Sequence, residues 1–123
     1  MKMFLMTNHN IRIETGTPDG DRFGFTEELF SGWLEYDPKN NIIYLHYIIS
    51  RKKNEGNVTV LIRKWLNEGY DVRVVMPRSI MQHILKKLRF EKSFEMFPDQ
   101  YAEEVEVWKS MERSYVGVST FTI

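Results

Sequence analysis

The chain has 123 residues, of which 42% are hydrophobic and 14% aromatic, a composition typical of a single globular domain over residues 1–123. Lys and Arg number 17, as do Asp and Glu, and this balance argues against a nucleic-acid partner. Cysteine is absent, which excludes disulfides and thiolate chemistry. The apolar stretch at the start is too short to cross a bilayer, so we expect a cytoplasmic protein without a membrane partner.

The first thirty residues predict strands joined by a turn. Ile11 and Ile13 alternate with polar residues, as in a half-buried strand. Residues 17–21 (TPDGD) have the composition of a tight turn. Residues 23–25 (FGF) are expected to open another strand, so this part of the chain predicts no helix.

A hairpin is expected next. Residues 30–36 form its first strand and residues 42–49 (IIYLHYII) form its second, with a turn of Asp, Pro, Lys and Asn between them. On the second strand, Tyr44, His46 and Ile48 should share one face, because alternate residues of a strand do. Trp33, Trp65 and Trp108 are expected to anchor the core.

A helix, a strand and a second helix follow. Apolar residues at helical spacing between residues 58 and 66 predict one buried helix face, which Gly69 would end. Residues 71–76 are rich in β-branched side chains and predict a strand parallel to 42–49. Ser79 is expected to cap a second helix. The apolar face of that helix is predicted to comprise Ile80, Ile84, Leu85 and Leu88.

The remaining chain predicts strands only. Residues 91–97 and 103–109 alternate and are expected to form a hairpin. Residues 114–123 form an apolar tail that would add an edge strand or pair with another copy in a homo-oligomer. The predicted fold is therefore α/β of the α+β kind, with a mixed, mostly antiparallel sheet that contains one parallel pair, and with flanking helices.

The turn between residues 49 and 58 carries the strongest functional signal. It is basic, contains Gly56, and leads from a strand into a helix. Such a turn directs several backbone N–H groups to one spot and favours phosphate binding. The plainest alternative is a solvated basic turn before an ordinary helix.

Around this turn, residues 32–109 resemble the GCN5-related N-acetyltransferases. Residues 53–58 (KNEGNV) stand where that family has an Arg/Gln-x-x-Gly-x-Gly/Ala turn, and residues 85–90 (LKKLRF) stand where its second helix ends. The resemblance implies that the parallel strands 42–49 and 71–76 splay apart, with acetyl-CoA as cosubstrate in the notch between them. It also implies a small-molecule or protein amine as acceptor. It implies a pantetheine arm along the main chain of Ile48 and Ile49. It further implies a pyrophosphate on the N–H groups of residues 54–58, which include Asn54, Gly56, Asn57 and Val58, with Lys53 as a further ligand.

Three further residues are candidates for roles in that chemistry. A general base often projects from the family's equivalent of the 42–49 strand, which points to His46, with Tyr44 as an alternative acting through water. Packing roles are the competing interpretation of both. Ser79 stands where the family often has an Asn that contacts pantetheine, although a simple cap would also explain it. The three histidines lack metal-ligand spacing, so no metal is expected.

The chain also departs from the family pattern. Val58 replaces the small residue at the phosphate turn, Glu55 adds a negative charge there, and Leu85 replaces a tyrosine that protonates the leaving thiolate. These departures leave a second hypothesis open, a catalytically inactive binding or protein-interaction module on the same fold. A nucleic-acid face built from the basic clusters near residues 51–53 and 86–89 is a third and weaker one.

Overall fold

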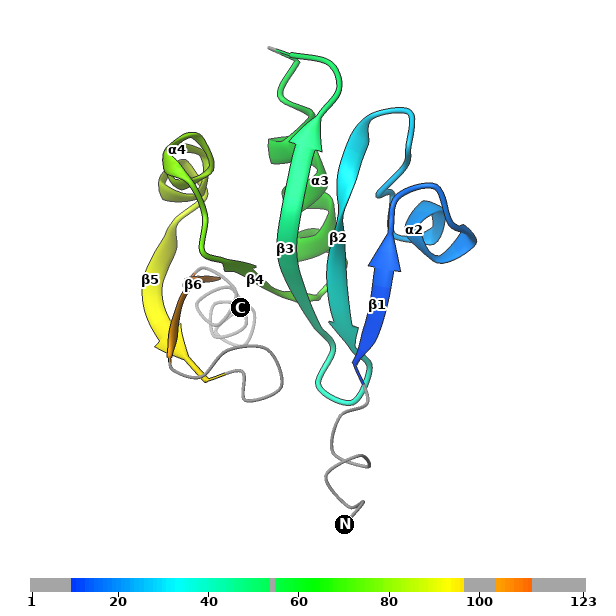
Figure 1. The fold of residues 1–123 in the computed structure, drawn as a ribbon. Coiled ribbons are helices and arrows are strands. Elements are labelled where there is room, and N and C mark those ends of the chain that lie inside the picture. The colour runs from blue at the N-terminus through cyan, green and yellow to red at the C-terminus, as the bar shows by residue number, and fades with distance from the viewer. Residues whose placement is uncertain (1–9, 54, 97–103, 112–123) are drawn as a thin grey trace, which may run out of the picture.

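The computed structural model describes residues 10–53, 55–96 and 104–111, which form a six-stranded sheet and three helices (Figure 1). The sheet has the order β1-β2-β3-β4-β6-β5. Only β3 and β4 pair in parallel among these strands, so the expected mixed, mostly antiparallel α+β sheet is confirmed. The elements are β1 (Ile11–Glu14), α2 (Pro18–Arg22), β2 (Phe30–Asp37), β3 (Ile42–Ser50), α3 (Asn57–Asn67), β4 (Asp71–Val75), α4 (Ser79–Lys87), β5 (Phe90–Glu95) and β6 (Val105–Ser110).

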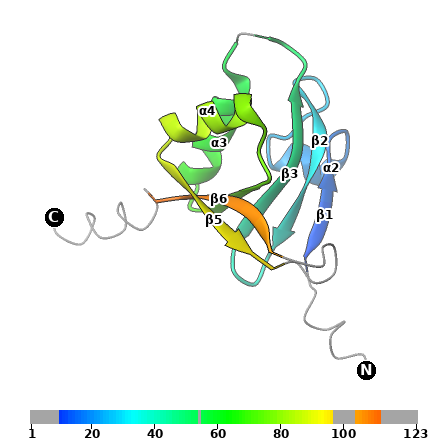
Figure 2. The same ribbon diagram turned by 60° about the vertical axis from the view of Figure 1, so that its left-hand side comes forward.

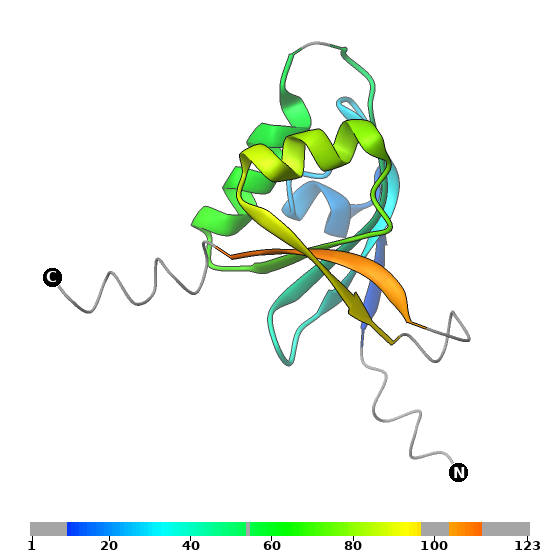
Figure 3. The same ribbon diagram turned by 90° about the vertical axis from the view of Figure 1, so that its left-hand side faces the viewer.

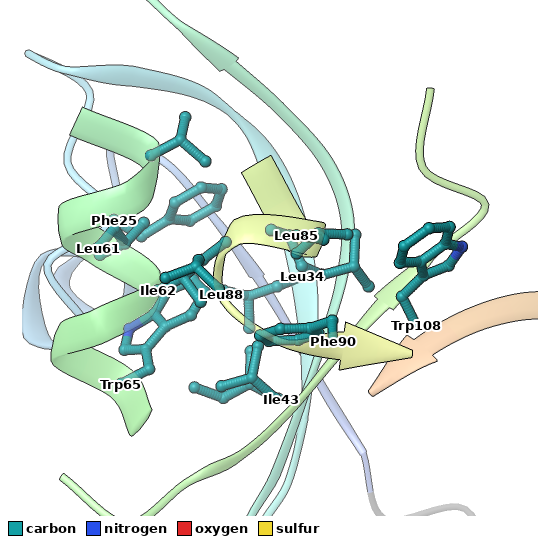
Figure 4. Packing of buried hydrophobic residues seen from close by; sticks show 14 of the residues in the cluster. Phe25, Leu34, Ile43, Leu61, Ile62, Trp65, Leu85, Leu88, Phe90 and Trp108 are labelled. Carbon is teal, nitrogen blue, oxygen red and sulfur yellow. The ribbon is translucent and has the colours of Figure 1, made fainter. Parts of the chain in front are cut away.

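The helices α3 and α4 lie on the same face of the sheet (Figures 2 and 3). α3 links β3 to β4 and α4 links β4 to β5, and in each case the two strands run in the same direction. The chain also moves the same way across the sheet in both connections. Because such crossovers are right-handed, both helices lie on one face. Between these helices and the sheet lies the main hydrophobic core (Figure 4). Its largest fully buried side chain is Trp65, whose indole N–H donates to the Phe23 carbonyl at 2.8 Å. The opposite face of the sheet is called the open face below.

The parallel strands β3 and β4 diverge part of the way along their length. Their paired residues run from Ile42 and Asp71 to Leu45 and Val74. Beyond that point β3 continues to Ser50 beside β2, whereas β4 ends at Val75 and the chain leaves for α4 (Figure 1). The splayed parallel pair expected from the sequence is therefore present.

A β-bulge lies where this divergence begins. Trp33 pairs with Tyr47, but the next residue of β2, Leu34, pairs with Leu45, so His46 is an extra residue in β3. The bulge places His46 and Tyr47 in succession on the open face. Ile48 consequently packs against the main core, and the expectation that it shares a face with His46 is wrong.

Gly32 permits β2 to approach β3 beside the bulge. Its φ is 149°, and a Cβ built there would lie 1.9 Å from the Tyr47 carbonyl oxygen. No side chain fits at that distance without moving the backbone of β3. The conformation of β3 near Tyr47 therefore depends on a glycine in the neighbouring strand.

The prediction for residues 17–25 is wrong. Residues 18–22 form a short helix instead of a turn, and Thr17 caps it by accepting a hydrogen bond from Gly20 N–H at 3.0 Å. Thr before Pro is as good a start for a helix as for a turn. Residues 23–25 form no strand, and Phe25 is buried in the core.

Two predicted core positions also differ. Trp33 lies on the open face, half-buried, rather than anchoring the core as Trp65 and Trp108 do. Ile80 is 79% exposed, so it is not part of the buried face of α4.

The hairpin of β5 and β6 is antiparallel, as predicted. The apolar tail at 114–123 lies outside the described residues.

Candidate functional site

A groove of about 860 Å³ opens where β3 and β4 separate. One side of it is the end of β3 and the turn that follows, and the other side is the chain from the end of β4 into α4. The first turn of α3 closes it at the end where β3 stops. Its floor and walls are mostly apolar and include Leu45, Ile48, Val58, Val74, Met81 and Ile84.

The N-terminus of α3 points its backbone donors at this groove. Gly56 precedes the helix with φ 68°, and no side chain within the described residues caps it. The first bond of the helix runs from Val60 N–H to the Gly56 carbonyl at 3.0 Å. The N–H groups of Asn57, Val58 and Thr59 precede that bond, and all three residues line the groove. This arrangement favours an anion.

A second helix begins at the same groove. Arg78 is the N-cap residue of α4, and its side chain makes no capping hydrogen bond within the described part of the chain. Ser79 is the first helical residue, so the prediction that it caps the helix is wrong. Pro77, Arg78 and Ser79 all line the groove, and Ser79 is exposed. The first residues of two helices therefore line one groove.

The charges around the groove have one sign. Lys52, Lys53 and Arg78 line it, and none of its lining residues within 10–53, 55–96 and 104–111 is an Asp or Glu. These three exposed residues are called the cationic end below. Arg51 is directed elsewhere, because its Nε donates to the Phe30 carbonyl at 3.2 Å. Glu55 is exposed and is not among the residues that line the groove.

The sequence departures at Val58 and Leu85 have a structural explanation. Val58 is 9% exposed and belongs to the main core, so its side chain packs beneath the helix. Leu85 is fully buried in the same core and does not line the groove. Asn57 has an enclosed Nδ2 atom without a partner among the described residues. Asn54 lies outside the described residues.

The predicted main-chain ledge is at the groove. Ile48 and Ile49 both line it, and they pair on one side with Gly32 and Ser31 of β2. Their other edge faces the space that β4 has left, because the parallel ladder stops at Leu45. An extended ligand with amide groups can pair with such an edge as an added strand.

His46 borders the groove, but its ring is enclosed. The side chain is 3% exposed and lies flat on Trp33, with ring centroids 4.2 Å apart and planes 3° apart. Its Nε2 is 2.8 Å from Glu35 Oε1, and the Arg12 guanidinium covers the other side of Trp33 at 3.9 Å. A base must reach the proton it removes. The predicted base role therefore requires the ring to become exposed.

Tyr44 is less suited to a base role. It lies on the open face against Val75, Val105 and Val107 and is not among the residues that line the groove. Burial raises the pKa of its phenol above 10.0, and Glu95 raises this pKa further, although Arg73 opposes them. A raised pKa keeps the phenol protonated at neutral pH, which is the wrong form for a base.

Sequence reasoning missed three groove residues. Tyr47 was assigned no role, although the bulge brings it to the groove with 47% of its surface exposed. Met76 was predicted to end the 71–76 strand, but β4 ends at Val75, so Met76 and Arg78 both lie in the connection between β4 and α4. The basic character of Arg78 beside a predicted helix start was the one signal available.

Comparison with known proteins returns no match: no family model fits the sequence, and neither curated proteins nor solved structures resemble it significantly. In the described part of the chain, no helix is long and apolar enough to cross a membrane. The same residues contain no group of three or more His, Asp or Glu side chains placed to hold a metal ion. Function therefore has to be argued from the groove.

Proposed function

We propose that this protein is a divergent GCN5-related acyltransferase that binds a coenzyme A thioester in the β3–β4 groove and transfers its acyl group to a primary amine. The observation that carries the proposal is the composition of the groove. A mostly apolar groove is lined by three cations and by the first residues of two helices, with no carboxylate among its described lining residues.

A coenzyme A thioester has the matching chemistry. Its nucleotide end carries phosphates, which suit the cationic end and the N–H groups of residues 57–59. Its pantetheine arm is slender and carries two amides, which suit the unpaired edge of β3 at Ile48 and Ile49. An isolated phosphate would use only one end of this groove. Nucleic acid would leave the apolar channel unused.

The reaction needs few protein groups. The amine nitrogen forms a bond to the thioester carbonyl carbon and the carbon–sulfur bond breaks. The nitrogen releases one proton to water, and the thiolate takes up one. Holding the two reactants together supplies much of the rate. We assign the proton for the thiolate to the Tyr47 phenol, which lines the groove beside the point where the strands separate. It would replace the tyrosine that the family carries where this chain has Leu85.

Calorimetric titration with coenzyme A and acetyl-CoA tests the proposal. Micromolar binding of both is expected, weakening as salt rises, because the phosphates meet exposed cations. Replacing Lys52, Lys53 or Arg78 with alanine should each lower the affinity about three- to tenfold. Lys39→Ala is the matched control, because Lys39 is exposed in the β2–β3 turn and does not line the groove. No binding at millimolar ligand contradicts the proposal.

The enclosure of His46 favours a second candidate, a module that binds the thioester without turning it over. With the ring 3% exposed, the described site presents no ready base. Release of free thiol from acetyl-CoA, measured with a panel of primary amines, separates the two. Amine-dependent release supports the transferase, whereas binding without release supports the module.

A further inference from the structure

Four apolar side chains line the groove and are exposed to solvent. Tyr47 and Ile49 on the β3 side are 47% and 48% exposed, and Met76 and Ile80 on the α4 side are 47% and 79% exposed. Apolar groups gathered at one groove indicate a surface that a ligand covers. Because the cationic end adjoins these residues, the ligand must combine negative charge with an apolar part.

Two of the four occupy equivalent positions on the diverging chains. The ladder ends at Leu45 and Val74, and Tyr47 and Met76 each follow two residues later. They therefore flank the start of the separation, whereas Lys52 and Lys53 follow the far end of β3. In the proposed complex this is where the thioester and its acyl group lie. Ile49 and Ile80 lie farther along, beside the pantetheine arm.

Met76 is held there at a cost in backbone energy. Its φ is 47°, in the left-handed region that residues other than Gly, Asn and Asp rarely adopt. A hydrogen bond from its N–H to the Glu106 carbonyl, 2.8 Å long, fixes this conformation from β6. Strained residues of this kind cluster at ligand sites. Glycine would relieve the strain, so the methionine side chain itself is the useful feature.

We infer that the acyl group carried in this groove is an apolar chain longer than acetyl, and that Tyr47 and Met76 hold it. The inference rests on the proposed function. An acetyl group offers one methyl to these two side chains, whereas a longer chain can cover both. Each methylene that leaves water contributes about 0.8 kcal/mol, equivalent to an affinity gain of about fourfold.

The test compares coenzyme A, acetyl-CoA and octanoyl-CoA by calorimetry, below the micelle concentration of the last. Octanoyl-CoA should bind at least about tenfold more tightly than acetyl-CoA, even if only part of its chain is covered. Affinities of the two within about twofold of each other overturn the inference while leaving the proposed function intact. If none of the three compounds binds, the proposed function itself fails.

Matched variants test whether the Met76 side chain causes the preference for octanoyl-CoA over acetyl-CoA. Met76→Gly should keep the fold, since φ 47° suits glycine, and should reduce the octanoyl preference to about threefold or less. Lys53→Ala should weaken all three ligands alike. Val60→Ser controls for nonspecific adsorption of the octanoyl chain to exposed apolar residues, because Val60 is 63% exposed but does not line the groove. An octanoyl preference unchanged in Met76→Gly contradicts the role of Met76.

The same apolar residues could instead contact a second copy of the chain. Sedimentation of the ligand-free protein shows whether a second copy of the chain, rather than an acyl chain, covers these residues. We expect no change in sedimentation when Met76 or Ile80 is replaced. A dimer that these replacements dissociate, together with equal binding of acetyl-CoA and octanoyl-CoA, would identify the surface as an interface and overturn the inference.

Discussion

Leu45 on β3 and Val74 on β4 form the final pair of the parallel ladder, and both line the groove, which opens from this pair onward. Both side chains are buried in the main core. The core therefore fixes the point at which the strands separate. Beyond it, β3 retains β2 as a neighbour on one side and offers its other edge to a ligand.

Gly56→Ala should weaken ligand binding through the backbone. A Cβ at Gly56 would meet nothing within 4 Å, so the penalty comes from φ 68° alone and should be about 1 kcal/mol of unfolding free energy. Gly69→Ala is a matched control, since its φ is 92° and its Cβ also meets nothing, at the other end of α3. Urea unfolding should show similar losses for both variants, and only Gly56→Ala should lower coenzyme A affinity.

Gly32→Ala should be far more damaging. The added Cβ would lie 1.9 Å from the Tyr47 carbonyl oxygen, so β2 and β3 must move apart at the bulge. We expect a loss of about 3 kcal/mol or more in unfolding free energy, compared with less than about 0.5 kcal/mol for Ser31→Ala next to it. Equal stabilities of the two variants would show that β2 does not constrain this part of β3.

Tyr47→Phe should separate catalysis from binding. The change removes the phenolic hydroxyl but keeps the ring that lines the groove. If the hydroxyl protonates the thiolate, kcat for thiol release should fall about tenfold or more, with the affinity for the thioester nearly unchanged. An unchanged kcat would mean that the thiolate leaves through water. Tyr70→Phe serves as the control, because Tyr70 is not a groove residue.

Tyr44 should make the protein less stable in alkali. Burial is the largest cause of the raised pKa of its phenol, so the folded state ionises above pH 10.0, whereas the unfolded chain ionises near it. The unfolding free energy is unaffected below that pH and should fall as the pH rises through and beyond 10. Urea unfolding at pH 8 and pH 10.5 should show a smaller alkaline loss in Tyr44→Phe than in the unchanged protein. Tyr36, whose pKa is also raised, should account for part of the alkaline loss in unfolding free energy that remains in Tyr44→Phe.

The strands and helices around the groove were predictable because their patterns are local. The apolar spacing of α3 and the β-branched run of β4 each follow from a few neighbouring residues. Gly56 was recognised for the same reason, since it stands between a strand and a helix. These patterns were enough to single out the connection between β3 and α3, which lines the groove.

The rest of the site depends on contacts between distant segments. Nothing in residues 42–49 marks His46 as the extra residue of a bulge, because the bulge arises from pairing with β2. The enclosure of its ring depends on Trp33 and Glu35, which lie on another strand. Arg78 was missed because a connection between elements has no periodicity to interpret, and the role of Met76 was missed because it was assigned to the end of the preceding strand.

The most direct test of the central claim is a backbone amide NMR titration of the unlabelled thioester into ¹⁵N-labelled protein. The account predicts the largest shifts at Gly56, Asn57 and Thr59, followed by Ile48 and Ile49, with little change at Lys39. Coenzyme A alone should cause the same shifts at Gly56, Asn57 and Thr59, which in this account contact the phosphates. Shifts confined to the open face, or none at millimolar thioester, would contradict it.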